Sequence, residues 1–268
     1  MSVKIGFIGC GNMGRALLDG WIGADCVTPA DVLVSTRQSG ERLKAHYGIQ
    51  PASTQTVFNA ADVVILAVKP QYYADVIGGL ELSSSQTLIS VMAGIETQAL
   101  RRYSSGGPVI RVMPNLASAV HSGATVGYCS PETPLDIIEF VQNLFESLGA
   151  FAWLETEDQF HPGTALVGSG PAFMFRAMAA FVDAGVALGL EDRVCRELAI
   201  AMVKGSARLA ESSTLELDAL CKSVASPGGT TIAGLNALSA GRFEAIITQA
   251  VTAAASRSKE LAEEGSKK

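Results

Sequence analysis

The chain has 268 residues, which is enough for one large domain or two modest ones whose cores need no metal or disulfide. The net charge is −6, and no run of Lys or Arg forms the basic stripe that nucleic acid requires, so we expect no nucleic-acid partner. The five cysteines are scattered and never form a CxxC pair, which is typical of reduced thiols and indicates no metal site.

Mean hydropathy is high for a soluble protein, at +0.29. The most apolar stretch, residues 177–190, is interrupted by Asp183 and is too short to span a bilayer. The first residues form an apolar run and a glycine turn where a signal peptide would need a longer apolar segment and a cleavage site. We therefore expect a cytoplasmic protein without membrane contact, whose excess apolar surface is buried against another subunit.

Short β-branched runs alternate with amphipathic segments in the first half of the chain, which predicts an α/β fold with a doubly wound, mainly parallel sheet. The predicted strands lie in residues 3–9, 31–36, 62–69, 87–94, 108–113 and 124–129. Beyond residue 158 the strands stop, and Ala-rich segments at helical spacing follow at residues 171–188, 192–211, 215–222 and 243–263. The sequence thus predicts an NADP-binding Rossmann domain over residues 1–157 and an all-helical domain over residues 158–268.

A glycine-rich turn with GxGxxG spacing follows the first predicted strand and opens a helical pattern. In such turns the first glycine permits a tight bend, the second lets the pyrophosphate approach the backbone, and the third allows close packing of helix on strand. The phosphates then rest on the helix N-terminus. The predicted cofactor-binding residues of this turn are Gly9, Gly11, Asn12, Met13 and Gly14.

The second predicted strand ends in Ser35, Thr36 and Arg37, beside the expected position of the adenosine ribose. NAD-specific proteins usually place an Asp or Glu there to bind the 2′-hydroxyl. Here two hydroxyls and a guanidinium are available instead, and these groups bind a 2′-phosphate. The sequence therefore favours NADPH as the cofactor, with NADH as a weaker one. The alternative is that Arg37 is only a solvated surface residue.

The next three strands carry further candidate cofactor contacts, because ligands of such sheets bind at the carboxyl ends of the strands. Lys69 either touches the cofactor there or pairs with a surface acid. Asn115 either hydrogen-bonds the nicotinamide amide or forms a turn. The candidates are Ala67, Val68, Lys69, Pro70, Ala93, Gly94 and Asn115.

Two segments of the helical half, residues 168–171 and 226–231, are too glycine-rich for ordinary helix. The first interrupts an apolar pattern before a long helix, and the second, SPGGTT, precedes a helix near Ile232. A glycine-lined helix start offers free backbone N–H groups and the positive end of the helix dipole, which favour a carboxylate. The alternative is a plain helix N-cap with a flexible turn.

Residues 219–238, ALCKSVASPGGTTIAGLNAL, resemble the signature segment of the pyrroline-5-carboxylate reductases. The segments GFIGCGNMG, AVKP and GSGPAF occur in the order that the family has. The resemblance covers essentially the whole chain, and SPGGTT is its most specific part. It implies a reductase that delivers hydride from NADPH to the ring C=N bond of a cyclic imino acid, 1-pyrroline-5-carboxylate, and makes L-proline.

The resemblance also implies an architecture in which the Rossmann domain precedes a helical dimerisation domain of the 6-phosphogluconate dehydrogenase C-terminal type. Two subunits intertwine, dimers often associate into decamers, and each active site forms where one subunit's cofactor domain meets its partner's helices. In the family, backbone amides of the SPGGTT segment take the substrate carboxylate, and the second threonine faces the ring nitrogen. The implied substrate-binding residues are Ser226, Gly228, Gly229, Thr230 and Thr231, with Thr231 as the catalytic one.

The chain departs from the family pattern at Val167, where members commonly have Ser, at residues 161–163, His-Pro-Gly, and at Thr54, where many members carry a ribose-binding Asn. We interpret its three histidines as surface or packing residues, because a protonated imine needs no strong general base. One alternative is a β-hydroxyacid dehydrogenase, for which Lys204 is the candidate lysine although Arg208 stands where an Asn is expected. Another is a non-enzymatic NADPH-binding regulator, which leaves SPGGTT unexplained.

Overall fold

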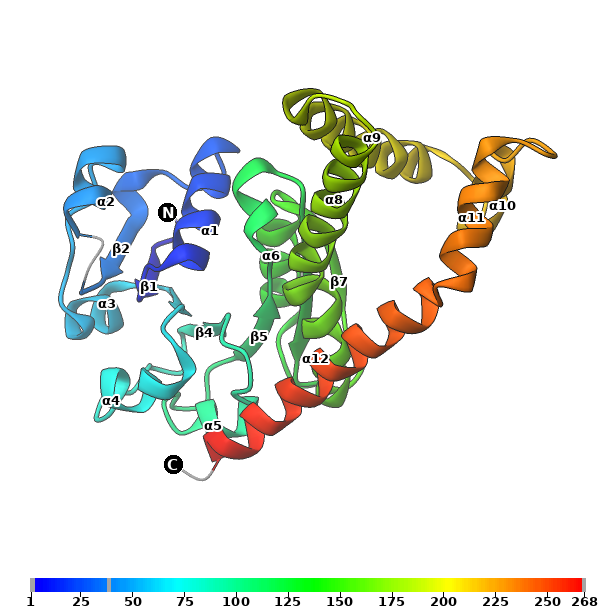
Figure 1. Cartoon of the computed structure of the whole chain (residues 1–268). Coiled ribbons are helices and arrows are strands. Elements are labelled where there is room, and N and C mark those ends of the chain that lie inside the picture. The colour runs from blue at the N-terminus through cyan, green and yellow to red at the C-terminus, as the bar shows by residue number, and fades with distance from the viewer. Residues whose placement is uncertain (1–2, 38–39, 267–268) are drawn as a thin grey trace. The chain divides into compact units, whose positions relative to one another are not determined.

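The computed structural model describes residues 3–37 and 40–266, and the chain divides into two compact units (Figure 1). Unit 1 comprises Met1–Gly168 and Ala253–Lys268, and unit 2 comprises Ser169–Thr252. The sheet unit therefore includes the end of the chain and the first helical residues beyond 157. The assignment of functional domains to residues 1–157 and 158–268 stays a prediction.

Unit 1 is built on a seven-stranded sheet of order β2-β1-β3-β4-β5-β6-β7. Neighbouring strands are parallel, except that β5 and β6 pair antiparallel. This is the mainly parallel sheet that the sequence predicts. The strands are β1 (Ile5–Ile8), β2 (Val32–Ser35), β3 (Val63–Leu66), β4 (Thr87–Ser90), β5 (Val109–Met113), β6 (Gly123–Cys129) and β7 (Gly149–Trp153).

The last strand, β7, is missing from the strands predicted by sequence. Its sequence, Gly-Ala-Phe-Ala-Trp, contains no β-branched residue and begins with glycine, both of which weaken the local signal. Gly149 has a φ of 140°, and a Cβ there would lie 2.1 Å from the Gly123 carbonyl oxygen of the paired strand. Pairing with β6, and not local propensity, thus forms this strand.

Each face of the sheet carries its own apolar core, because alternate residues of a strand point to opposite faces. Phe7 of β1 packs with α1 and α6, whereas its neighbour Ile8 packs with α3, α4 and α5 on the other face. On the first face, Trp21 Nε1 donates to the Leu144 carbonyl at 2.7 Å. The helices of this unit are α1 (Asn12–Gly23), α2 (Gly40–Tyr47), α3 (Thr54–Ala60), α4 (Tyr73–Ile77), α5 (Thr97–Arg101), α6 (Leu135–Glu146) and α7 (Phe160–Gly163).

Unit 2 is all helical and has little core of its own. Cys195 and Ala199 are the only buried side chains among residues 169–252, all of which the structure describes. Large apolar side chains are exposed instead, such as Phe175 at 65% and Leu188 at 86%. The helices are α8 (Gly170–Ala187), α9 (Asp192–Ser212), α10 (Leu217–Ser223), α11 (Thr230–Ala240) and α12 (Phe243–Ser266), whose last turns belong to unit 1.

The chain enters unit 2 through one continuous helical stretch. A π-helical turn, Thr164–Ser169, joins α7 to α8, so the glycines at residues 168–171 do not break the helix as the sequence had indicated. By length and apolar composition alone, Glu157–Ala187 could cross a membrane, and no other helix among the described residues meets that test. The stretch is longer than residues 177–190, so helix length does not argue against a span.

Candidate active site

A cavity of about 600 Å³ opens at the carboxyl ends of β1, β2 and β3 in unit 1. The segments that follow these strands form its wall, and the 3-10 turn Pro70–Tyr72 begins at Pro70, directly after Lys69. The structure thus brings together candidates from three separate parts of the sequence, although their contact with a cofactor stays a prediction. The predicted residues in the lining are Gly9, Gly11, Ser35, Thr36, Arg37, Ala67, Val68 and Lys69.

The three glycines of the first turn have different surroundings. Gly9 has a φ of 86°, and a Cβ there would lie 2.7 Å from the Ala67 carbonyl oxygen, so only glycine fits. A Cβ on Gly14 would lie 3.3 Å from the Gly9 carbonyl oxygen, which reflects close packing of the helix on the turn. Gly11 lines the cavity and has nothing within 4 Å of its Cβ position. That open space is what the approach of a pyrophosphate requires.

Helix α1 starts beside this open space and has no side-chain cap at its N-cap residue, Gly11. Its first backbone N–H groups are therefore free for a ligand, and the helix dipole favours a negative one. Asn12 instead accepts from Arg15 Nη2 at 2.6 Å, and Met13 packs against the core. The turn and the helix start thus fit the diphosphate of a dinucleotide.

The end of β2 presents donors to the same cavity. The hydroxyl of Ser35 is hydrogen-bonded to that of Thr54 at the start of α3, with 2.9 Å between Oγ and Oγ1. Both residues line the cavity together with Arg37. Hydroxyls and a guanidinium are suitable donors for a phosphate.

The lining also contains residues that are not among the predicted cofactor contacts: Cys10, Thr54, Tyr72, Asp75 and Val76. Cys10 lies within the glycine turn, and burial raises the pKa of its thiol to about 11, so the residue remains a neutral thiol near pH 7. Thr54 begins α3, at the position where many members of the family carry a ribose-binding Asn. The other three belong to α4 and the turn before it, whose sequence carries no motif that singles them out.

The remaining cofactor candidates follow β4 and β5 and do not line this cavity. Ala93 is partly buried, and Gly94, with a φ of 72°, packs under α12, where a Cβ would lie 2.9 Å from Leu261 Cβ. Asn115 is buried, and its Oδ1 accepts from the Ala117 backbone N at 3.0 Å to cap a short turn. The turn-forming alternative for Asn115 is therefore present in the structure, and its contact with the nicotinamide stays a prediction.

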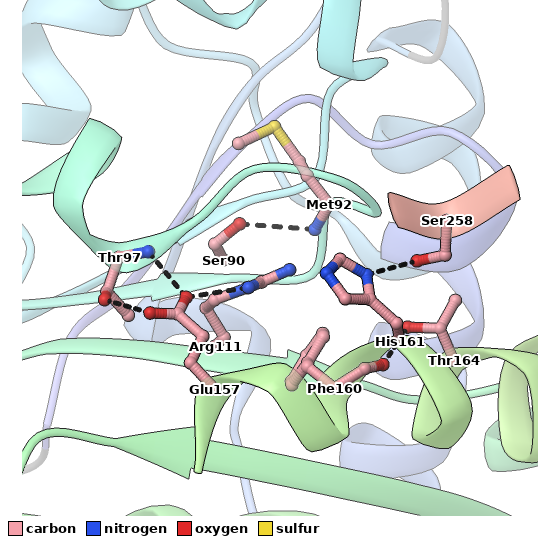
Figure 2. A network of polar contacts seen from close by, with 9 residues as sticks. All are labelled: Ser90, Met92, Thr97, Arg111, Glu157, Phe160, His161, Thr164 and Ser258. Atoms are coloured by element: carbon pink, nitrogen blue, oxygen red, sulfur yellow. Dashed lines mark hydrogen bonds and ion pairs between the residues drawn. The ribbon is translucent and has the colours of Figure 1, made fainter. Parts of the chain in front are cut away.

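An ion pair at the edge of the core links the middle of β5 to the start of the helical stretch (Figure 2). Arg111 of β5 is 1% exposed, and its Nη1 lies 2.7 Å from Glu157 Oε1. Its guanidinium carbon lies 4.0 Å from the ring centre of Phe160, and Glu157 also accepts from the backbone N and Oγ1 of Thr97. Burial lowers the pKa of Arg111 and the Glu157 carboxylate opposes this, so the guanidinium remains charged. The pair joins the start of the helical stretch to the sheet.

His161 of α7 extends this network to the end of the chain. Its Nδ1 lies 3.1 Å from Ser258 Oγ of α12, and Figure 2 shows its other ring nitrogen on the side of Arg111. Burial, and next the charge of Arg111, lower the pKa of His161. The Nε and Nη2 of Arg111 have no hydrogen-bond partner among the described residues. A neutral His161 that donates from Nδ1 to Ser258 fits these surroundings.

The glycine-rich segment of unit 2 forms a turn that leads into α11. Gly228 has a φ of 71°, and the Gly229 backbone N donates to the Ser226 carbonyl at 3.0 Å. A Cβ on Gly229 would lie 2.6 Å from Ser226 Oγ, and Gly229 caps α11 without a side-chain hydrogen bond. Thr230 and Thr231 are the first residues of α11, and Thr231 is half-buried. Free N–H groups are thus available here, and their binding of a carboxylate stays a prediction.

Relatives match the chain over nearly its full length. A pyrroline-5-carboxylate reductase from Pseudomonas aeruginosa is 36% identical, with 97% of each chain covered. One from Escherichia coli is 33% identical over 97% of this chain and 99% of the relative. The chain belongs to the pyrroline-5-carboxylate reductase family. A model for pyrroline-5-carboxylate reductase dimerisation matches residues 157–261, and one described as NADP oxidoreductase coenzyme F420-dependent matches residues 4–94.

Solved structures of the family have the same fold. The Plasmodium falciparum pyrroline carboxylate reductase with NADP bound has a TM-score of 0.87 and 27% identity, with 97% of this chain and 98% of that chain covered. The Coxiella burnetii enzyme has a TM-score of 0.84 and 30% identity, with 97% and 99% covered. The predicted family, the Rossmann fold followed by a helical dimerisation region, and the use of NAD(P)H are confirmed. Lys204, on which the rival dehydrogenase hypothesis depends, is exposed on α9.

Proposed function

We infer that the protein reduces the ring C=N bond of 1-pyrroline-5-carboxylate with hydride from NADPH and releases L-proline. The observation that carries this inference is the open glycine turn and its cavity, in a chain that matches family members over 97% of its length. The ring carbon gains the hydride, and the nitrogen, protonated from solvent before transfer, becomes the secondary amine. The cofactor leaves in its oxidised form.

The cavity residues hold the cofactor, which supplies the hydride when bound. Gly11 and the N-terminus of α1 take the pyrophosphate. Ser35, Thr36 and Arg37 take the 2′-phosphate, so NADPH is preferred and NADH is the weaker cofactor. Thr54 holds the hydroxyl of Ser35 in place through their hydrogen bond. Ala93, Gly94 and Asn115 lie nearer the nicotinamide.

The substrate binds at the start of α11. The backbone N–H groups of Gly228, Thr230 and Thr231 anchor its carboxylate, because the N-cap residue Gly229 offers them no side-chain cap. The Gly229 N–H is already used by the Ser226 carbonyl, so Gly229 shapes the turn. The N–H of the protonated imine then donates to the hydroxyl of Thr231. The reaction requires orientation and an anchored carboxylate, and no side chain has to act as a strong base.

The active unit is a dimer, in which the cofactor cavity of one subunit meets the α11 turn of its partner. The support is the apolar surface that unit 2 leaves exposed, which includes Phe175, Phe181 and Leu188. Five such dimers associate into a decamer, and the enzyme works in the cytoplasm. Light scattering of the purified protein distinguishes a dimer from a decamer.

A steady-state assay tests the reaction directly. We expect oxidation of NADPH that depends on 1-pyrroline-5-carboxylate, with proline detected as the product in equal amount. A β-hydroxyacid with NADP serves as the rival substrate. Binding of NADPH without turnover of the imino acid, or turnover of the hydroxyacid alone, would contradict the inference.

A further inference from the structure

One wall of the cofactor cavity has no role in the function proposed above. It is formed by Tyr72, Asp75 and Val76, which lie on α4 and the turn before it. Tyr72 is a large aromatic residue that is 51% exposed. Asp75 brings a carboxylate into the lining of a cavity that is otherwise suited to an anionic cofactor. These features call for a ligand group that is flat, apolar on its faces and able to donate a hydrogen bond.

The fold of this segment turns these three side chains toward the cavity. Tyr73 and Ile77 are buried in the core that covers one face of the sheet. Residues three or four positions apart lie on the same face of a helix. Tyr73 and Ile77 occupy the buried face, so Tyr72, Asp75 and Val76 lie on the face that is turned away from the core. The cavity lining contains all three members of that set.

The position of this wall matches one part of the dinucleotide. The glycine turn takes the pyrophosphate, and the end of β2 takes the adenosine ribose. The base is bonded to that ribose, so it lies in the same cavity. With the turn and the end of β2 occupied, the wall on α4 remains for the base. This step rests on the proposed binding of NADPH.

We propose that Tyr72 and Val76 contact the faces of the adenine ring and that Asp75 accepts a hydrogen bond from its exocyclic amine. An aromatic ring and an aliphatic side chain both suit the flat faces of a base. The amine is the donor that adenine offers to a carboxylate. The charged residues of the lining are Arg37, Lys69 and Asp75. The two cations suit the phosphates of the cofactor, and Asp75 is placed to select the base.

The test compares NADPH with its deamino analogue, in which hypoxanthine replaces adenine and a carbonyl oxygen replaces the amine. Dissociation constants are measured by calorimetry on the purified full-length protein. We expect the parent to bind NADPH about tenfold more tightly, because the carboxylate of Asp75 loses its donor and faces an oxygen in the analogue. In Asp75→Asn the amide either accepts from the amine or donates to the carbonyl, so this ratio should fall to within about twofold.

Two further variants separate base selection from general effects. Tyr72→Ala should weaken both dinucleotides by a similar factor and leave their ratio unchanged, because stacking does not depend on the amine. Asp136→Asn on α6 makes the same change of charge outside the cavity lining and should retain the parent's ratio. An unchanged ratio in Asp75→Asn, or a parent that does not distinguish the two dinucleotides, overturns the proposal.

The same measurements separate this proposal from the proposed function. A protein that prefers NADPH over the deamino analogue through Asp75, yet fails to reduce the imino acid, supports the adenine wall and contradicts the reaction. A protein that reduces the imino acid but binds the two dinucleotides equally tightly supports the reaction and overturns the adenine wall. Failure to bind both dinucleotides overturns both.

Discussion

Unit 1 and unit 2 differ in where their apolar side chains lie. In unit 1 both faces of the sheet are covered by helices, and strands such as Val63–Leu66 are buried along their whole length. In unit 2 the helices bury only Cys195 and Ala199 among residues 169–252, all of them described, and leave large apolar residues exposed. The first unit is thus complete within one chain, whereas the second has the surface of a structure that requires a partner. The dimerisation model covers this part of the chain.

The largest effect is expected from a charge placed on the apolar surface of unit 2. Phe175→Glu should separate the subunits and abolish most of the activity, because a carboxylate buried at the interface without a partner costs several kcal/mol. Light scattering and the NADPH assay measure the two consequences. Leu135→Glu on α6 is the matched control, since Leu135 is 75% exposed in unit 1. If the parent protein is an active monomer at micromolar concentration, unit 2 does not require a partner. If Leu135→Glu dissociates as much as Phe175→Glu, the interface is not specific to unit 2.

A smaller loss is expected at the start of α11. Thr231→Ala removes one hydrogen bond to the imine, worth on the order of 1–3 kcal/mol, so kcat/KM should fall about ten- to a hundredfold. The affinity for NADPH should barely change, because the cavity proposed for the cofactor lies in unit 1.

Thr231→Ser is the control for the methyl group, since it retains the hydroxyl. It should recover much of the rate that Thr231→Ala loses. If Thr231→Ala stays folded and keeps its kcat/KM within about twofold of the parent, the substrate is placed wrongly.

The third effect concerns the cofactor alone. Arg37→Ala should weaken NADPH about tenfold more than NADH, because it removes a charge-assisted hydrogen bond to the 2′-phosphate, worth about 1.5–3 kcal/mol. Arg42→Ala on α2 makes the same charge change outside the cavity lining and should affect both cofactors little. Equal weakening of NADPH and NADH in Arg37→Ala would show that the guanidinium does not meet the 2′-phosphate.

The sequence predicts those parts of the fold and the candidate site that local patterns encode. The glycine turn was found because Gly9, Gly11 and Gly14 occupy fixed positions relative to a strand and a helix. The wall at Tyr72, Asp75 and Val76 was missed because the fold, and not a motif, brings these residues to the cavity. Residues 168–171 were predicted to interrupt the helix, since glycine and proline usually signal a break. Instead, the π-helical turn Thr164–Ser169 leads directly into α8.

The Arg111 network was missed for a related reason. Arg111 lies in the middle of an apolar strand, and Glu157 is far from it in sequence. A charged residue that is buried in such a run requires an oppositely charged partner, and the sequence does not identify which acid is that partner. His161 likewise gains its surroundings from α12, nearly a hundred residues later in the chain.

The smallest effect is expected from the titration of His161. Burial and Arg111 lower its pKa in the folded protein below the unperturbed value of about 6.5. Between these two pKa values the unfolded chain binds more protons than the folded one, so the free energy of unfolding rises with pH across this window. Its full contribution is present above about pH 6.5 and is lost as the pH falls toward the folded pKa. Urea unfolding at a series of pH values measures this dependence.

His161→Asn removes the titrating ring and keeps a polar group near Ser258. The part of the acid sensitivity that belongs to His161 should disappear in this variant, whereas His46→Asn, on the surface of α2, controls for the loss of a histidine. The charges that face His161 besides Arg111 are those of Glu96, Asp158 and Lys259, and the two acids favour its protonation. If these acids dominate, an NMR titration will place the pKa of His161 above about 6.5. Protonation would then stabilise the fold at low pH, and the account of a neutral His161 beside Arg111 would be wrong.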